Sequence, residues 1–332
     1  MRAIVYARGG FASADLPVPE PGPGEVRVRI TVSGVNPTDW KARERAAEPD
    51  GRTVPNQDGA GVVDAVGPDT TLAAGTRVWV WEAAWQRPDG TAQEYVVLPE
   101  RQAVPLPDNA SFDLGASVGI PAMTAHRCLT VADGGPERLG PGALAGRTVL
   151  VAGGAGAVGN AAIQLARWSG ATVLSTVSGP EKAELAKAAG AHHVVNYRTG
   201  NPVGEIETLA PSGVDIVVEV SPATNAALDA AVTGPNATVA VYATDGGDNL
   251  GLPVFPLMLH NIRYQFVLVY TVPEAAKQDA VAAVSAAIEA GALRAGADAG
   301  LPLHHFPLDR TAEAHAAVRA GAVGKVLISL PD

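Results

Sequence analysis

The sequence is poor in the residues that cross-link small folds or bind zinc. Cys128 is the only cysteine among 332 residues, so an intramolecular disulfide is impossible and a cysteine-based zinc site is excluded. Aromatic residues make up 5% of the chain. No apolar run approaches the ~20 residues that a membrane-spanning helix needs, and the first residues are too short and too charged a stretch for a signal peptide. We therefore expect a soluble, cytoplasmic protein.

Clusters of positive charge are also missing. The formal net charge is −10, and Lys and Arg are scattered along the chain, which argues against nucleic acid and against an anionic membrane as the main partner. The length is sufficient for roughly two domains with sizeable cores.

A glycine cluster in mid-chain is the most informative feature that is present. The apolar run 149–152 leads into Gly154, Gly156 and Gly159, and a helical pattern begins at once. This G-x-G-x-x-G spacing, between a strand and a helix, is typical of a dinucleotide-binding loop. Its glycines permit a tight turn, close approach of a pyrophosphate, and close helix–strand packing. We expect residues 154 and 156–159, including Ala157 and Val158, to hold the pyrophosphate at the helix N-terminus.

The two parts of the chain differ in their patterns. The first 120 or so residues are predicted to be all-β, forming a small, partly open barrel with short strands between Gly and Pro punctuation. From about Pro121, apolar strands alternate with Ala-rich helices, which favours a doubly wound parallel sheet in an α/β protein. The six predicted strands of this second part are 148–152, 171–177, 193–197, 214–220, 238–243 and 264–270. The final strand, 324–330, is predicted to return and complete the first domain.

The end of the second predicted strand of this sheet indicates the cofactor. An Asp or Glu about 20 residues beyond the glycines would select NAD through the adenine ribose, and none is present at 176–179. Ser178, Lys182 and Tyr197 could instead bind the 2′-phosphate of NADPH. The alternative is that Lys182 is a solvated helix residue beside Glu181.

These features together resemble the zinc-independent medium-chain dehydrogenases/reductases, in particular the quinone oxidoreductase (zeta-crystallin-like) branch. The resemblance is carried by 34–39 (Gly-Val-Asn-Pro-Thr-Asp), 58–67, 75–78, 90–96, 121–125, the glycine loop, 181–186 and the terminal Gly324-Lys325-Val326. It implies a GroES-like catalytic domain at 1–120 and 266–332, a Rossmann domain at 121–265, and an active site between them. It also implies NADPH as hydride donor and a homodimer joined near residues 264–270.

The resemblance also bears on metal. Zinc-dependent relatives place Cys, a His-Glu pair and a second Cys at the catalytic metal. Asn36 stands here at the first cysteine position, Asn56-Gln57-Asp58 replaces Gly-His-Glu, and the four-cysteine structural lobe is missing. Because Asn and Gln are poor zinc ligands, we expect no metal.

Without a metal, conjugated acceptors are the favoured substrates. Hydride addition to a simple ketone concentrates charge on one oxygen, whereas addition to a quinone or an enone spreads it over the π system. Such acceptors need positioning, exclusion of water and one or two hydrogen bonds. The candidate catalytic residues are Asn36, whose amide can donate, and Asp39, which could instead only bond backbone in the turn after Pro37. Tyr242 is the alternative proton donor.

Further contacts are predicted for the cofactor and for the substrate. Val241 should border the cofactor, and the resemblance adds Phe266 and Val267 at the nicotinamide and Lys325. Trp40, Trp81 and Trp85 could stack on a flat conjugated ring, the alternative being that they belong to the core. We thus expect an NADPH-dependent reductase of quinones or other conjugated carbonyls. A biosynthetic enoyl reductase acting on a carrier- or coenzyme-bound intermediate, and a non-catalytic NADPH-binding protein, remain as alternatives.

Overall fold

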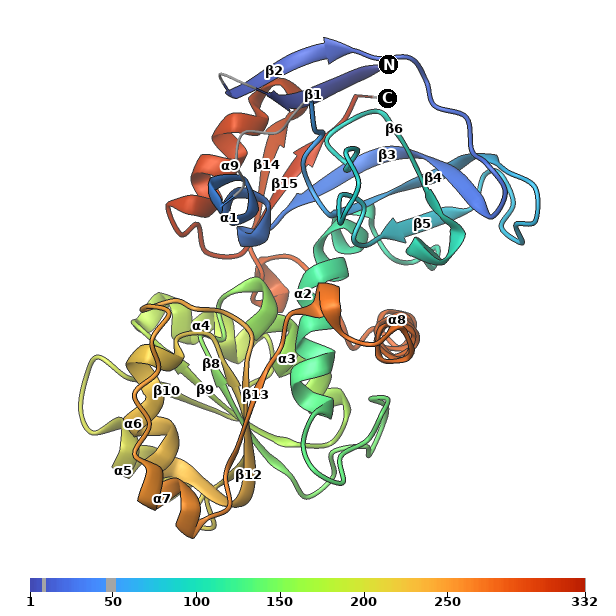
Figure 1. The fold of residues 1–332 in the computed structure, drawn as a ribbon. Helices are drawn as coiled ribbons and strands as arrows, with labels where there is room; N and C mark the ends of the chain where they lie inside the picture. The colour runs from blue at the N-terminus through green and yellow to red at the C-terminus, as the bar shows by residue number, and fades with distance from the viewer. Residues whose placement is uncertain (8–9, 46–51, 332) are drawn as a thin grey trace. The chain divides into compact units, whose positions relative to one another are not determined.

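The computed structural model describes residues 1–7, 10–45 and 52–331, and the chain divides into two compact units (Figure 1). Unit 1 comprises 1–120 and 303–332, and unit 2 comprises 121–302. We expected the return to the first domain at residue 266. In the structure, residues 266–302 group with unit 2 and the return begins at residue 303. The reason is the bonding of this segment to the helix after the glycine loop: Asn160 donates to the carbonyl of Ala299, and Gln164 exchanges two hydrogen bonds with the backbone of Arg294.

Unit 1 is built on a seven-stranded sheet and a separate hairpin. The sheet runs β14-β15-β3-β4-β5-β7, and β6 pairs with β3. The strands are β1 Arg2–Ala7, β2 Gly10–Asp15, β3 Glu25–Val35, β4 Asp58–Val66, β5 Arg77–Val80, β6 Tyr95–Pro99, β7 Ala103–Pro105, β14 Leu303–Pro307 and β15 Lys325–Ser329. Because β15 pairs antiparallel with β3, the predicted return of the last strand is confirmed.

The expectation that the first 120 residues are all-β is wrong. This range contains α1 (Pro37–Arg45) and the first part of α2 (Phe112–Thr130). Two short 3₁₀ helices, η1 (Glu100–Gln102) and η4 (Leu308–Arg310), and α9 (Thr311–Arg319) complete unit 1. The cause at α1 is local: Pro37 suits the first helical turn, and Asp39 accepts a hydrogen bond from the backbone N–H of Asn36, 2.7 Å away, as in a capping box.

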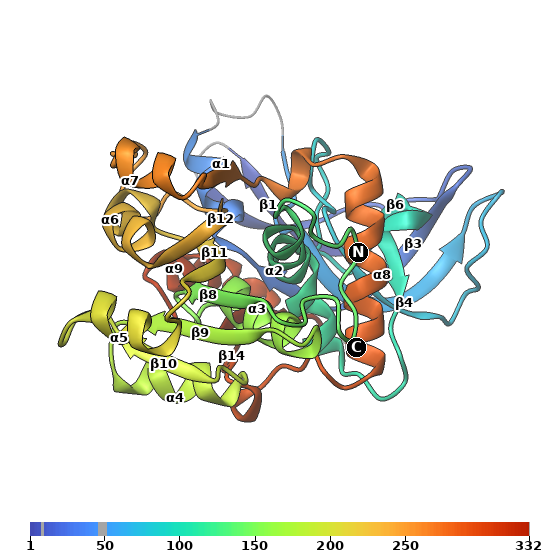
Figure 2. The ribbon, with the colours of Figure 1, turned by 90° about the horizontal axis from the view of Figure 1, so that it is seen from below.

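Unit 2 contains the predicted doubly wound sheet. Six parallel strands run in the order β10-β9-β8-β11-β12-β13, and Figure 2 shows β10, β9, β8, β11 and β12 in sequence across it. They are β8 Thr148–Ala152, β9 Thr172–Val177, β10 His193–Asn196, β11 Val214–Glu219, β12 Thr233–Val241 and β13 Arg263–Phe266. This order, with the first strand central and reversal between β8 and β11, is that of a dinucleotide-binding fold.

Helices connect the strands of this sheet. Right-handed crossovers place α3 and α4 on one face and α5 and α6 on the other, and α5 and α6 pack together. The remaining helical segments of unit 2 follow β12 and β13 or precede β14. The helices are α3 Ala157–Trp168, α4 Pro180–Ala188, α5 Pro202–Leu209, α6 Pro222–Val232, α7 Val254–Leu259, α8 Glu274–Glu289, η2 Val269–Thr271 and η3 Ala297–Ala299. In the described ranges, no helix is long and apolar enough to cross a membrane.

Candidate functional site

The glycine loop between β8 and α3 is shaped by close packing. A Cβ built on Gly159 would lie 2.4 Å from the carbonyl oxygen of Gly153, and one on Gly154 would lie 2.1 Å from Oγ of Ser175. Both distances are far shorter than van der Waals contact. These two glycines therefore allow α3 to start directly against the sheet.

Gly156 has a different surrounding. Its Cβ would meet nothing closer than 3.5 Å, so the chain itself does not require glycine here. Gly156 is also the N-cap of α3, where no side chain caps the helix. The N–H groups of the first turn, from Ala157, Val158 and Gly159, are thus left for an outside acceptor. An uncapped helix N-terminus beside a glycine with room for a ligand fits a pyrophosphate.

The three predicted 2′-phosphate contacts lie at one edge of the sheet. Ser178 follows β9 and Tyr197 follows β10, and the two strands pair with Asn196 opposite Val177. Lys182 lies in the first turn of α4. Within the described ranges no carboxylate pairs with the Lys182 ammonium, although Glu181 adjoins it in sequence. A hydroxyl, a phenol and an unpaired cation on consecutive elements are suited to a phosphate.

The predicted nicotinamide contacts lie at the same carboxyl edge. Val241 ends β12 opposite Phe266, which ends β13, and the N–H of Val267 donates to the carbonyl of Val241 at 2.7 Å. Phe266 is 63% exposed, whereas Val241 and Val267 are buried. Tyr242 follows directly. Burial, with the charges of Cys128, Glu219 and Asp245, raises its pKa well above the usual value, so Tyr242 is a weak acid for a proton-donating role.

A buried polar cluster in unit 1 contains Asn36. Nζ of Lys325 donates to Oδ1 of Asn36 at 2.8 Å and lies 3.3 Å from Oδ2 of Asp58. Nδ2 of Asn36 donates to the same Oδ2 at 2.7 Å, and the N–H of Ile120 donates to Oδ1 of Asp58 at 2.8 Å. Strand register brings these residues together, since Asp58 lies opposite Gly34 on β3 and Val326 lies opposite Val35.

Burial shifts the pKa values of the ionisable groups in and beside this cluster. Burial raises the pKa of Asp58 and lowers that of Lys325, while each group's charge opposes the shift of the other. Asp39 is half-buried on α1, and burial, with a smaller contribution from the charge of Asp58, raises its pKa to about 7. A carboxyl that titrates near neutral pH is suited to exchanging protons. The expected alternative for Asp39, a bond to backbone, is also present.

The structure gives Lys325 contacts that the resemblance did not predict, and its cofactor role stays a prediction. Sequence resemblance assigned it to the cofactor, but its side chain is 1% exposed and its ammonium is engaged by Asn36 and Asp58. The sequence reasoning missed the partnership with Asp58. A signal was present, because Asp58 and Lys325 each begin a mainly apolar strand, and buried charges require a partner.

The three candidate substrate tryptophans differ in access. Trp81 is fully buried, which favours the alternative that it belongs to the core. Trp40 is half-buried on α1, with Nζ of Lys41 and Cζ of Arg319 each 5.7 Å from its ring centroid. These cations already occupy its aromatic face. Trp85 is half-buried in the turn after β5, and its contact with a substrate stays a prediction.

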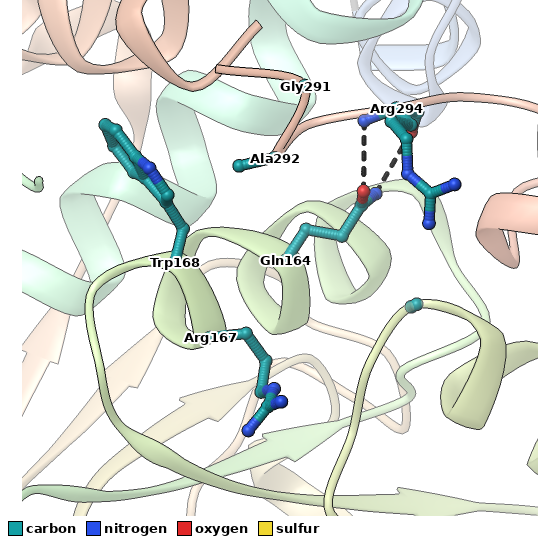
Figure 3. A pocket seen from close by; sticks show the side chains of 7 residues that line it. Gln164, Arg167, Trp168, Gly291, Ala292 and Arg294 are labelled. Carbon is teal, nitrogen blue, oxygen red and sulfur yellow. Dashed lines mark hydrogen bonds between the residues drawn. The ribbon is translucent and has the colours of Figure 1, made fainter. Parts of the chain in front are cut away.

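A hollow of about 460 Å³ lies elsewhere in unit 2 (Figure 3). It lies at the C-terminal end of α3, away from the glycine loop, and is lined by Gln164, Arg167, Trp168, Ala189, Gly291, Ala292 and Arg294. The amide of Gln164 holds the backbone of Arg294, as the dashed lines show. Arg167 lies in the last turn of α3, where a cation stabilises the helix dipole. These contacts serve the fold, so we leave the hollow outside the candidate site.

Comparisons with known proteins agree with this architecture. Residues 22–108 match the alcohol dehydrogenase GroES-like domain, and residues 157–286 match the zinc-binding dehydrogenase family. A quinone oxidoreductase from Pongo abelii is 29% identical over 99% of this chain and 98% of its own length. The chain belongs to the medium-chain dehydrogenase/reductase family. Its quinone oxidoreductase relatives establish this member as an oxidoreductase.

Two solved structures of the family carry different cofactor names. A structure described as an NAD-dependent alcohol dehydrogenase is 29% identical, with a TM-score of 0.84 over the full length of both chains. The quinone oxidoreductase of Thermus thermophilus, solved also with NADPH, is 26% identical, with a TM-score of 0.80 over 99% of this chain and all of that one. A nicotinamide cofactor is therefore supported, and the choice between its two forms depends on this chain's own residues.

The zinc named in one family description does not fit the residues of this medium-chain reductase. Oδ1 of Asn36 accepts from the Lys325 ammonium, both oxygens of Asp58 are hydrogen-bonded, and Oε1 of Gln57 accepts from the N–H of Ala84 at 3.1 Å. Zinc prefers thiolate and imidazole ligands, and a cation already lies among these oxygens. Across the part of the chain that the structure describes, no three His, Cys, Asp or Glu residues are grouped to hold a metal.

Proposed function

We propose that this protein is an NADPH-dependent reductase of quinones or other conjugated carbonyls that works without a metal. The observation that carries the proposal is the polar cluster of unit 1. Asn36 and Asp58 stand at positions that the resemblance assigns to zinc ligands, and the Lys325 ammonium lies within reach of both. Conjugated acceptors need less charge stabilisation, because their developing charge is delocalised. The quinone oxidoreductase relatives support the same substrate class.

We assign the cofactor contacts to the carboxyl edge of unit 2. NADPH, when bound, would supply the hydride. The backbone of Gly154, Gly156, Ala157, Val158 and Gly159 would bind the pyrophosphate, and Val241, Phe266 and Val267 would border the nicotinamide. Ser178, Lys182 and Tyr197 would bind the 2′-phosphate. Support for NADPH over NADH comes from the unpaired Lys182 and from the lack of an acid at the end of β9.

Two residues of unit 1 would act on the acceptor. Asn36 would donate a hydrogen bond to its carbonyl oxygen, where negative charge develops. Asp39 would supply the proton that completes reduction, because a carboxyl with a pKa of about 7 is partly protonated at neutral pH. Trp85 would contact the flat ring of the acceptor.

A homodimer is part of the proposal. β13 is an edge strand that pairs only with β12 among the described strands, and its end and the preceding helix expose large apolar side chains. These are Val254, Phe255, Met258, Leu259 and Phe266. An unpaired edge next to exposed apolar residues fits a second copy of the chain. Light scattering should give a dimer for the wild type and a monomer for the double variant Phe255→Asp, Met258→Asp.

The direct test of the activity is NADPH oxidation against a set of acceptors after dialysis against EDTA. The set comprises 1,4-benzoquinone, 2-cyclohexen-1-one, trans-2-hexenal and cyclohexanone, each repeated with NADH. We expect turnover of the conjugated acceptors only, faster with NADPH. Turnover of cyclohexanone, or activity lost to EDTA and restored by zinc, would contradict the metal-free proposal. Tight NADPH binding without any turnover would favour a non-catalytic role.

A further inference from the structure

The hydrogen bonding of Asn36 leaves one of its amide protons without a partner. Oδ1 accepts from Lys325, and Nδ2 gives one hydrogen to Asp58. No acceptor for the second Nδ2 hydrogen is found among the described residues, although the Asn36 residue is only 3% exposed. Buried donors of this kind are rarely left unsatisfied, so a ligand group is the expected acceptor.

The two charged partners also determine the orientation of the Asn36 amide, with Oδ1 toward Lys325 and Nδ2 toward Asp58. A lysine ammonium can only donate, and a carboxylate can only accept. Rotating the amide by 180° would place its N–H against the Lys325 ammonium and its oxygen against Asp58. Both contacts would then be repulsive, so the flipped state is strongly disfavoured at this buried position.

The surrounding chain is shaped to hold Lys325 and Asp58 in place. A Cβ on Gly119 would lie 2.3 Å from Oδ1 of Asp58, so glycine at this position makes room for the carboxylate. A Cβ on Gly34 would lie 2.0 Å from the carbonyl oxygen of Ala116 and 3.1 Å from Cε of Lys325, so glycine there lets the chain of α2 and the lysine stem pack closely against β3. The N–H of Ile120 then fixes the remaining oxygen of Asp58.

We infer that Lys325 and Asp58 are positioning residues that hold the Asn36 amide with one N–H directed to the acceptor carbonyl. This inference rests on the proposed function and deepens it, because it assigns the charged pair to catalysis through Asn36. It differs from the cofactor role first expected of Lys325. A residue that acts only through Asn36 has no effect once Asn36 is gone.

The test is a double-mutant cycle with 2-cyclohexen-1-one and NADPH. Asn36→Ala should lower kcat by roughly 10²–10³-fold, as removal of an oxyanion donor does. Lys325→Met should lower kcat by roughly tenfold or more, with the Kd of NADPH within about twofold of the wild type. The double variant should be no slower than Asn36→Ala alone, because residues that act as a unit are not additive.

Two controls separate positioning from stability. Lys325→Met leaves Asp58 buried without its cation, so Lys325→Met, Asp58→Asn restores neutrality and should regain stability without regaining kcat. Lys277→Met removes another buried lysine, which donates to the carbonyl of Tyr270 at 2.8 Å, and should behave additively with Asn36→Ala. The inference is overturned if Lys325→Met slows the Asn36→Ala enzyme by the same factor as the wild type, or if it acts by raising the Kd of NADPH.

A second readout does not depend on turnover. In protein labelled with ¹⁵N-asparagine, the two side-chain amide protons of Asn36 should differ widely in chemical shift, because one bonds a carboxylate. Lys325→Met should shift both resonances, and Lys277→Met should leave them unchanged. Unshifted Asn36 resonances in Lys325→Met would overturn the inference. Failure of the wild type to reduce any conjugated acceptor would contradict the proposed function alone.

Discussion

The cofactor edge of unit 2 and the polar cluster of unit 1 are built in opposite ways. The centre of the first is backbone from one short stretch, 153–159, whose glycines leave room for close packing and for a ligand. The second is made of side chains from distant parts of the chain, so that Lys325 and Asn36 lie 289 residues apart in sequence. Substitutions that add volume should therefore impair the glycine loop of unit 2. Substitutions that remove a hydrogen bond or a charge should impair the polar cluster of unit 1.

The largest effect is expected from adding one methyl group to the glycine loop. Gly159→Ala forces a Cβ within 2.4 Å of the Gly153 carbonyl, so it should destabilise the fold by about 1–3 kcal/mol and abolish NADPH binding. Gly156→Ala is the matched control, since its Cβ meets no atom closer than 3.5 Å. It should destabilise the fold less than Gly159→Ala, because alanine is only a poorer N-cap than glycine, yet bind NADPH roughly tenfold or more weakly. Equal losses of stability in a thermal melt would contradict the claim that packing requires glycine at 159 but not at 156.

The second-largest effect is expected in unit 1, from a substitution that removes the charge of Asp39 and keeps the shape of its side chain. Asp39→Asn keeps an oxygen that can accept from Asn36 but cannot supply a proton. The pKa of about 7 means that the protonated form predominates below neutral pH, so wild-type kcat should fall as pH rises above 7. Asp39→Asn should be slower by roughly 10² and show no such fall. An unchanged pH profile of kcat in this variant would show that Asp39 serves only as a helix cap.

Lys182→Ala tests the side-chain part of the cofactor edge. Loss of one charged hydrogen bond costs about 1.5–2 kcal/mol, so the Kd of NADPH should rise roughly 10- to 30-fold. The Kd of NADH should be unchanged, because it has no 2′-phosphate. Lys187→Ala, on the same helix and paired with Glu184 at 2.8 Å, is the control. Equal losses for the two cofactors in Lys182→Ala would assign Lys182 to the solvated surface.

The smallest effect concerns a buried acid pair of unit 2. Burial, with the charge of Glu219, raises the pKa of Asp229 to about 9 from a usual 3.8. The folded state therefore holds a proton that the unfolded state releases above pH 4, so this group makes stability fall as pH rises from about 4 to 9. Asp229→Asn cannot ionise, and its loss of stability between pH 6 and 7 should be smaller by about 1.4 kcal/mol, the linkage slope for one proton over one pH unit. Parallel urea-unfolding profiles for both proteins would contradict this assignment.

The same contrast explains what the sequence could predict. The glycine loop, the six parallel strands and the return of the last strand follow from local spacing and from apolar patterns, and all are confirmed. Helix α1 was missed because its start depends on a hydrogen bond between Asp39 and backbone, which a charged segment does not reveal. The sequence left open whether Trp81 contacts a substrate or belongs to the core, because its burial depends on packing by distant parts of the chain.

The cluster around Asn36 was predictable only in part. A resemblance in sequence selects Asn36 and Asp39 as candidates, since they lie within one short motif. The pairing of Asp58 with Lys325 depends on two strand registers on either side of β3, and register is a tertiary property. Lys325 was consequently assigned to the cofactor, whereas the structure directs its ammonium to Asn36.

The central claim is that this reductase delivers hydride to a conjugated carbon without a metal. NADPH carrying deuterium at the transferable C4 position, incubated with 2-cyclohexen-1-one and the EDTA-treated protein, tests it directly by mass spectrometry and NMR of the product. We predict cyclohexanone with deuterium at the former β-carbon and an intact carbonyl group. Deuterium on a carbinol carbon, in 2-cyclohexen-1-ol, would show reduction of the carbonyl itself and contradict the account.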